Sequence, residues 1–120
     1  MSPKQWDLSS AVVQILDFRE ERDWAQFHRP KELAAGLAIE AAELQELFLW
    51  RDGETAADVS RDSERMKALR NEIADVAIYV LMLSHDLGID LPAAIEDKLV
   101  QNAERYPPSE YRGSADKAPH

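Results

Sequence analysis

The spacing of apolar residues along the chain predicts four helices and no strand. Apolar positions recur every three or four residues, which is the repeat of an amphipathic helix that turns one face toward a core. The expected helices run from an N-cap at Ser9 or Ser10 to Arg22 and over residues 31–50, 62–87 and 91–104. The predicted fold class is therefore all-α, an antiparallel domain of the four-helix-bundle type.

The second and third predicted helices carry carboxylates on their apolar faces. On a helical wheel, Glu40 and Glu43 fall in the arc of leucines that should face the core. Glu72 and Asp75 fall in the corresponding arc of the third helix. Burial of an unpaired carboxylate costs several kcal/mol in order of magnitude. The pattern therefore requires a positive charge between these two helices.

An antiparallel pairing of the two helices would bring these carboxylates together. Glu40 and Asp75 are equally distant from a point within the polar segment 51–63, and Glu43 and Glu72 share the same midpoint. If that segment is the turn of a helical hairpin, a hard divalent cation resolves the repulsion of the four groups. Oxygen ligands alone favour Mg²⁺, with Mn²⁺ as the alternative, whereas di-iron bundles need Glu-x-x-His pairs. The other interpretation is that one or two carboxylates turn outward and pair with arginine or lysine.

The connector between the first two predicted helices is rich in rings. Residues 23–30 hold Trp24, Phe27 and His28, which is unusual for a solvated loop. Because the residue before Pro30 is steered away from helical geometry, the second helix should begin close to this proline. Trp24 and His28 therefore either close one end of the bundle or line a ligand pocket, and both interpretations stay open.

Two further candidates follow the first carboxylate pair. Glu46 lies one turn beyond Glu43, where it suits a general base or a ligand of a metal-bound water. A solvated glutamate at the helix rim is the alternative. Trp50 lies one turn further on, and an exposed tryptophan there could stack on a flat ring.

Composition and charge narrow the classes of function. The 120 residues carry a net charge of −9, which argues against nucleic-acid and anionic-membrane partners, and they include no cysteine. The first residues lack the apolar core of a signal peptide, and no apolar run approaches the length of a membrane span. We therefore expect a cytoplasmic protein with a single domain over residues 1–106. The proline-rich and polar residues 107–120 are expected to form a disordered tail.

These motifs resemble those of a known family over residues 8–107. The stretches that carry the resemblance are, in chain order, Glu21-Arg22-Asp23-Trp24-x-x-Phe27-His28-x-Pro30, Glu40-x-x-Glu43-Leu44-x-Glu46-Leu47-Phe48-x-Trp50, Glu72-x-x-Asp75-Val76-x-Ile78-Tyr79, and Asp90-Leu91-Pro92 with the later Lys98, Asn102 and Arg105-Tyr106-Pro107. Each stretch is weak by itself, but their order and spacing are specific. The chain resembles the MazG-like all-α nucleoside triphosphate pyrophosphohydrolases, and among them the dCTP pyrophosphatases.

The resemblance implies an activity and a set of roles. Family members hydrolyse a nucleoside triphosphate to the monophosphate and pyrophosphate and require Mg²⁺, which the resemblance assigns to the four carboxylates identified above. Four residues match positions around the base and sugar, namely Trp24, His28, Trp50 and Tyr79. Three residues of the last helix match a phosphate-binding segment, namely Lys98, Asn102 and Arg105. A solvated basic helix face is the alternative for these three.

Assembly of several copies is a further expectation. Residues 76–83 are apolar on every face of the third helix, so a neighbouring copy should cover them. The family forms dimers or tetramers, and we expect a homo-oligomer, with a tetramer favoured over a dimer. On antiparallel helices Trp50 and Tyr79 should point toward opposite ends of the metal cluster. A nucleotide site shared across an interface, with one ring supplied by the second subunit, is therefore predicted.

Two other classes of function remain open. The chain could be a regulatory module that binds a nucleotide with little turnover, or a helical interaction protein whose acidic pairs form surface ion pairs. Metal dependence separates the interaction protein from the other two classes. Release of pyrophosphate separates the enzyme from the regulatory module.

Overall fold

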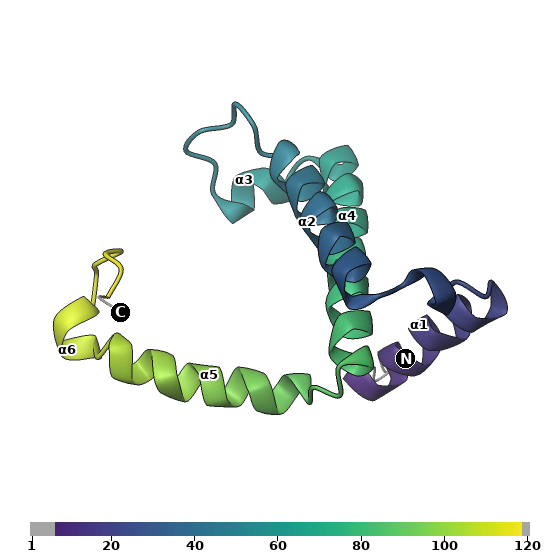
Figure 1. The fold of residues 1–120 in the computed structure, drawn as a ribbon. Coiled ribbons are helices and arrows are strands. Elements are labelled where there is room, and N and C mark those ends of the chain that lie inside the picture. Colours follow the sequence, from purple (N-terminus) through teal and green to yellow (C-terminus); the bar gives the residue numbers. More distant parts are fainter. Residues whose placement is uncertain (1–6, 119–120) are drawn as a thin grey trace, which may run out of the picture. The chain divides into compact units, whose positions relative to one another are not determined.

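The computed structural model describes residues 7–118, and every regular element in that range is a helix. The elements are α1 (Leu8–Glu21), the 3₁₀ turn η1 (Ala25–Phe27), α2 (Pro30–Glu46), α3 (Ala56–Ser60), α4 (Ser63–Asp86), α5 (Leu91–Arg105) and α6 (Pro108–Tyr111) (Figure 1). The prediction of an all-α chain is confirmed. Backbone contacts divide the chain after Leu87 into two compact units, which are described separately.

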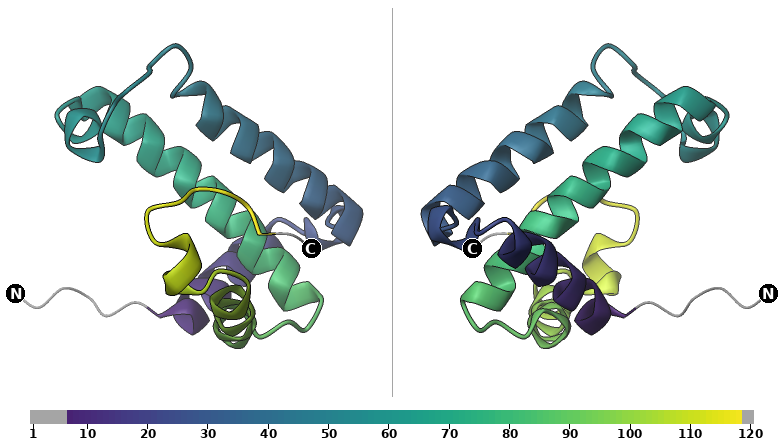
Figure 2. Two further views of the ribbon diagram at one scale, coloured as in Figure 1. Left: turned by 90° about the vertical axis from the view of Figure 1, so that its left-hand side faces the viewer. Right: turned by 90° about the vertical axis from the view of Figure 1, so that its right-hand side faces the viewer.

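The first unit is built on an antiparallel pair of helices. α2 and α4 lie side by side along most of their length, and the connector that joins them contains the short helix α3 (Figure 2). Leu33 of α2 is fully buried, and Leu69 and Met82 of α4 are nearly so. The hairpin expected from the midpoint of the acidic residues is therefore present, and α1 packs against α4 beside it.

Acidic and hydroxyl side chains begin most of these helices. Asp62 accepts a hydrogen bond from the backbone N–H of Arg65, which starts α4 where the sequence predicted. The first helix starts earlier than expected, because Asp7 rather than Ser9 or Ser10 is its N-cap and accepts from the N–H of Ser10 at 2.8 Å. A carboxylate at this position also interacts favourably with the helix dipole, and its pKa is lowered by that hydrogen bond.

The predicted extension of the second helix to Trp50 is wrong. α2 ends at Glu46, and Trp50 has a left-handed backbone with φ of 64°. Arg65 of α4 donates to the carbonyl of Leu47 from Nε at 3.2 Å and from Nη2 at 2.9 Å. In a continued helix that carbonyl would accept the N–H of Arg51, which bonds instead to Phe48. A contact from α4 thus accompanies the end of the helix.

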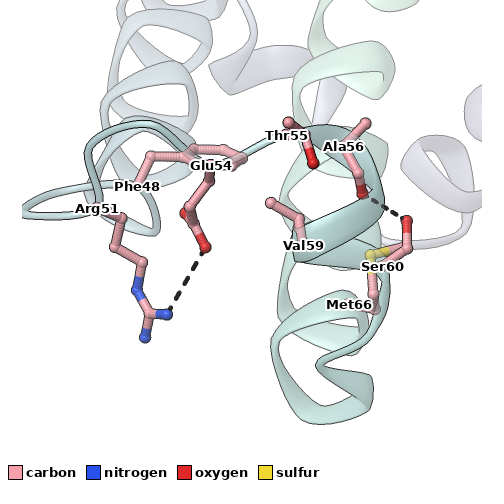
Figure 3. Close-up of a pocket in the computed structure, with 8 residues that line it drawn as sticks. All are labelled: Phe48, Arg51, Glu54, Thr55, Ala56, Val59, Ser60 and Met66. Atoms are coloured by element: carbon pink, nitrogen blue, oxygen red, sulfur yellow. Dashed lines mark hydrogen bonds and ion pairs between the residues drawn. The ribbon is translucent and has the colours of Figure 1, made fainter.

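The connector after α2 is also ordered by charge. The Arg65 guanidinium donates two hydrogen bonds to the Glu54 carboxylate. Arg51 Nη1 lies 3.9 Å from Oε2 of the same carboxylate (Figure 3). Thr55 and Asp58 form a reciprocal capping box that starts α3, a helix that the sequence analysis did not predict. Ion pairs and a capping box therefore hold this connector in a defined conformation.

A buried ion pair fastens α1 to the end of α4. Arg19 Nη1 and Nη2 donate to the two oxygens of Asp86 at 2.8 and 2.9 Å. The Arg19 side chain is 11% exposed and that of Asp86 is 21% exposed, so this bidentate pair is partly shielded from water. It joins the C-terminal parts of α1 and α4.

The second unit consists of α5, α6 and the residues after them as far as residue 118. Asp90 caps α5 and Pro92 lies in its first turn, as the sequence predicted. Pro108 starts the short helix α6, and Tyr111 packs edge-to-face on Tyr106. The disordered tail expected over residues 107–120 stays a prediction. The single-domain assignment of residues 1–106 stays a prediction.

Among residues 7–118, no single helix has the length and apolar character needed to cross a membrane. α4 and α5 meet the criterion only when taken together as a broken pair, by length and composition.

Candidate functional site

Three carboxylates converge between α2 and α4. Glu40 and Glu43 lie one turn apart on α2 and Glu72 lies on α4, and one oxygen from each lies within 4.8 Å of the others. Among residues 7–118, no ion pair includes any of these three carboxylates. We call this group, Glu40, Glu43 and Glu72, the acidic cluster. It brings together three of the four carboxylates that the sequence predicted to meet.

Two oxygens of the acidic cluster are buried without a partner. Glu40 Oε2 and Glu72 Oε2 are inaccessible to solvent and accept no hydrogen bond from any group of residues 7–118. Unsatisfied buried oxygens that carry negative charge are costly, so their retention needs a compensating group. All three donors are hard carboxylate oxygens, which is the ligand set that Mg²⁺ and Mn²⁺ prefer. The residues of the cluster therefore fit a divalent cation.

The electrostatics of the cluster agree with an absence of compensating cations. Burial raises the pKa of Glu40, and the neighbouring carboxylates of Glu72 and Asp75 raise it further. The pKa of Glu43 is raised first by its contact with Glu40 and then by repulsion and burial. Crowding of like charges thus opposes ionisation where the two helices meet.

A cavity of about 270 Å³ opens beside the acidic cluster. Its wall combines residues of α1, α2, α4 and the η1 segment, which is η1 with its flanking residues Trp24 and His28. The polar and aromatic members of the wall are Phe18, Arg19, Trp24, His28, Glu40, Asp75 and Tyr79. Asp75, the fourth predicted carboxylate, thus lies on the cavity wall with Glu40 and is not one of the three that converge. Trp24, His28 and Tyr79, which the resemblance assigned to base and sugar, line the same cavity within one chain.

The η1 segment brings its two rings to this cavity by a tight turn after α1. Asp23 adopts a left-handed backbone with φ of 52°, and the N–H of Trp24 returns to the carbonyl of Arg19 at 3.1 Å. The Trp24 ring then packs edge-on against Phe18 at 5.6 Å and His28 at 6.5 Å between ring centroids. His28 Nδ1 is buried, and no group of residues 7–118 hydrogen-bonds to it. The cavity therefore has an aromatic wall that includes an imidazole ring.

Two predicted site residues lie outside this cavity. Glu46 is the exposed last residue of α2, and its charge contributes to the raised pKa of Glu43. Trp50 is 94% exposed beyond the end of α2 and is not among the residues that line the cavity. The structure therefore gathers Trp24, His28 and Tyr79 but leaves Trp50 facing solvent.

The predicted phosphate-binding residues lie on α5, in the second unit. Lys98, Asn102 and Arg105 are spaced by four and three residues, so they share one face of that helix. Lys98 is exposed, whereas Arg105 donates from Nη2 to the carbonyl of Ala118 at 3.1 Å. The Arg105 Nε is buried without a partner. Their role toward phosphates stays a prediction.

Sequence reasoning missed three contributors to the site. Phe18 and Arg19 line the cavity, although only a broad apolar face was expected of α1. Gly36 lies against the ring of Tyr79, and its signal was visible as a glycine in the interior of a helix. None of the three belongs to a spaced motif, and the Arg19 guanidinium is paired with Asp86, which explains why motif spacing did not reveal them.

Several known proteins are similar to this chain in sequence. The model of the MazG-like family matches residues 36–118. dCTP pyrophosphatase 1 of Rattus norvegicus is 43% identical over 102 residues, and that of Homo sapiens is 42% identical over 102 residues. Each alignment covers 84% of this chain, and the chain spans 59% of the length of either relative.

A solved structure extends the match to the fold. The crystal structure of a pyrophosphatase from Archaeoglobus fulgidus gives a TM-score of 0.73 at 32% identity, with 89% of this chain and 98% of that chain covered. The family model covers well over half of the chain, and it includes the whole acidic cluster. The chain belongs to the MazG-like family.

Proposed function

We propose that the chain is a Mg²⁺-dependent nucleoside triphosphate pyrophosphohydrolase that acts on dCTP or a base-modified dCTP. The reaction cleaves the anhydride between the α- and β-phosphates with one water and yields the monophosphate and pyrophosphate. One observation carries the proposal: two buried oxygens of the acidic cluster, with no hydrogen-bond partner among residues 7–118, lie beside a cavity with an aromatic wall. The relatives named dCTP pyrophosphatase 1 support the choice of base.

The acidic cluster would hold the metal, with Asp75 as the fourth carboxylate. When bound, Mg²⁺ neutralises phosphate charge and promotes attack by water, which lets a chain of net charge −9 accept a triphosphate. Glu46 lies at the end of α2 beyond Glu43, where its carboxylate can orient a water and accept a proton from it. In this proposal Glu43 and Glu46 are the catalytic carboxylates.

The cavity would take the nucleoside. Trp24 offers a ring face for stacking, and Nδ1 of His28 can hydrogen-bond to the base or sugar. We assign the phosphates to Lys98, Asn102 and Arg105 by resemblance. For this role Arg105 would exchange its bond to the carbonyl of Ala118 for one to a phosphate.

We further propose that copies of this domain, which is of the four-helix-bundle type, form a homo-oligomer, a tetramer rather than a dimer. The oligomer would act on free nucleotides in the cytoplasm. Between α1 and α4 an apolar groove of about 380 Å³ includes Phe18 and Ile78, which are 50% and 37% exposed. Such a surface on a helix that was expected to be covered on all sides supports a partner copy. Trp50, left outside its own chain's cavity, would supply a ring to the neighbour's site.

A substrate panel tests the proposal. Purified protein is incubated with each dNTP and NTP and with 5-methyl-dCTP, with Mg²⁺ or with EDTA, and pyrophosphate is measured. We expect Mg²⁺-dependent release of pyrophosphate, fastest with a deoxycytidine triphosphate. Nucleotide binding without release would identify the regulatory module instead. Absence of both metal and nucleotide binding would leave the helical interaction protein.

A further inference from the structure

Gly36 occupies an unusual place in the site. It lies in the interior of α2, one turn before Glu40, where glycine is the least favourable residue after proline for helix stability. Its backbone is not in the left-handed region that favours glycine, since the glycines with positive φ among residues 7–118 are Gly53, Gly88 and Gly113. A requirement for space, rather than for backbone conformation, is therefore the explanation to test.

The space beside Gly36 is filled by the ring of Tyr79. A Cβ atom at position 36 would lie 2.5 Å from Cε1, 2.6 Å from Cζ and 2.9 Å from the hydroxyl oxygen of that ring. Carbon atoms in favourable contact are separated by about 3.5–4.0 Å, so a methyl group and this ring position exclude each other. The tyrosine lies where it does because position 36 has no side chain.

This contact continues the register of the acidic residues. Gly36 precedes Glu40 by one turn on α2, and Tyr79 follows Asp75 by one turn on α4. Because the helices are antiparallel, the Gly36–Tyr79 pair is the next layer after the Glu40–Asp75 pair. Glu40, Asp75 and Tyr79 all line the cavity of about 270 Å³. The glycine is not among the residues that line this cavity, but it contacts Tyr79, which is.

We propose that Gly36 is a specificity-determining residue, which widens the cavity by letting the hydroxyl end of the Tyr79 ring approach α2 closely. This inference rests on the proposed function, because it concerns the base that the cavity accepts. A side chain at position 36 displaces the ring away from α2, and the open space next to the ring is the cavity itself. The glycine thus provides room for a substituent on the base, and base-substituted deoxycytidine triphosphates are the ligand class that gains from it.

Kinetics of Gly36→Ala test the specificity. The variant is assayed with dCTP and 5-methyl-dCTP, with Ala35→Ser on the exposed neighbouring position as the matched control. We expect the ratio of kcat/KM values to shift about tenfold against the methylated nucleotide, which is the effect of one methyl group in a tight pocket. The change should appear mainly in KM, because Glu43 and Glu72 are untouched. An unchanged ratio would overturn the proposal.

A second measurement tests the contact without any turnover. Gly36→Ala is made in the wild-type chain and in Tyr79→Ala, and all four proteins are melted in EDTA. Alanine should raise the midpoint by several degrees in the Tyr79→Ala background, where only its helix propensity acts, and should give no rise or a fall beside the native ring. Equal rises in both backgrounds would overturn the steric argument. If no nucleotide is hydrolysed by the wild-type protein, the proposed function fails while this coupling is still measured.

Discussion

The acidic cluster and Glu54 are two groups of carboxylates on the same helical hairpin, in opposite surroundings. Glu54 receives two hydrogen bonds from the guanidinium of Arg65, one at 2.8 Å, and the Arg65 side chain is only 7% exposed. Within residues 7–118, Glu40, Glu43 and Glu72 have no such partner, although two of their oxygens are buried. One group is completed by the protein's own arginine, and the other is left incomplete.

The direction of the pKa shifts expresses the same difference. Arg65 lowers the pKa of Glu54, as Arg19 lowers that of Asp86, because each guanidinium favours the charged carboxylate. The pKa values of Glu40 and Glu43 are raised instead. Compensated carboxylates serve to join segments of the fold, whereas uncompensated ones indicate a ligand that the polypeptide does not supply.

The largest effect is expected from removing charge in the acidic cluster. Glu43→Gln and Asp75→Asn keep the shape of the side chains but weaken the oxygen ligands, so turnover of dCTP with Mg²⁺ should fall at least ~100-fold. Pyrophosphate release measures the loss, and circular dichroism checks that helicity is kept. Glu64→Gln, on the exposed face of α4, is the control and should retain its rate. Near wild-type turnover in either ligand variant would remove the distinction between the two groups of carboxylates.

A smaller effect is expected in the connector after α2, which the Glu54–Arg65 pair stabilises. Trp50 is presented there in a left-handed backbone and is 94% exposed. Trp50→Ala should raise the KM for dCTP about tenfold if its ring stacks on the base, since such stacking is worth about 1–3 kcal/mol. Trp50→Phe keeps a ring and should recover part of the affinity. A KM that is unchanged by Trp50→Ala would exclude the ring from the site.

Mixing two inactive or weakened chains tests whether Trp50 acts across an interface. When Glu43→Gln chains exchange with Trp50→Ala chains, some mixed sites should contain both intact groups, and activity should partly return. Lack of recovery, with exchange verified by native mass spectrometry, would place the whole pocket in one chain. Light scattering on the same samples gives the oligomeric state, and a monomer would contradict the assembly.

A further effect, on stability rather than turnover, is expected at Asp86, the second compensated carboxylate. Because Arg19 holds the pKa of Asp86 below its ordinary value of 3.8, the pair stabilises the fold above that pH and loses its contribution as pH falls through the folded pKa. Asp86→Asn should therefore lower the free energy of unfolding by ~2 kcal/mol at neutral pH, with the deficit shrinking below pH 3.8. Urea unfolding from pH 7 to pH 3 measures this loss of stability, with Asp17→Asn at an exposed position of α1 as the control. A deficit independent of pH would contradict the ion-pair account.

Local signals in the sequence predicted most of the fold. α4 was expected over residues 62–87 and spans Ser63–Asp86, because Asp62 and Gly88 are strong cap and stop signals. The end of α2 was missed, since it coincides with a contact from Arg65, 18 residues from Leu47 in the chain. α3 was missed for another reason, because its Thr55–Asp58 capping box is visible in the sequence and was not used.

The residues of the site were also predicted where the signal is local in the sequence and missed where it depends on packing between helices. Helical spacing and one midpoint were enough to expect Glu40, Glu43 and Glu72 to meet. The same reasoning could not place Trp50, because its position depends on where α2 ends. It also could not reveal the contact of Gly36 with Tyr79, which depends on the distance between two helix backbones. Periodicity predicts which residues share a face, whereas packing distance decides which of them touch.

The central claim is that the acidic cluster is a metal centre, and titration with Mg²⁺ tests it most directly. Calorimetry and thermal melting are performed on the EDTA-treated wild type, on Glu72→Gln and on the control Glu64→Gln. Mg²⁺ should release or absorb heat and raise the melting midpoint of the wild type and Glu64→Gln, but should do neither at the same concentrations for Glu72→Gln. Identical midpoints with and without millimolar Mg²⁺, together with no detectable heat in the wild type, would contradict the account.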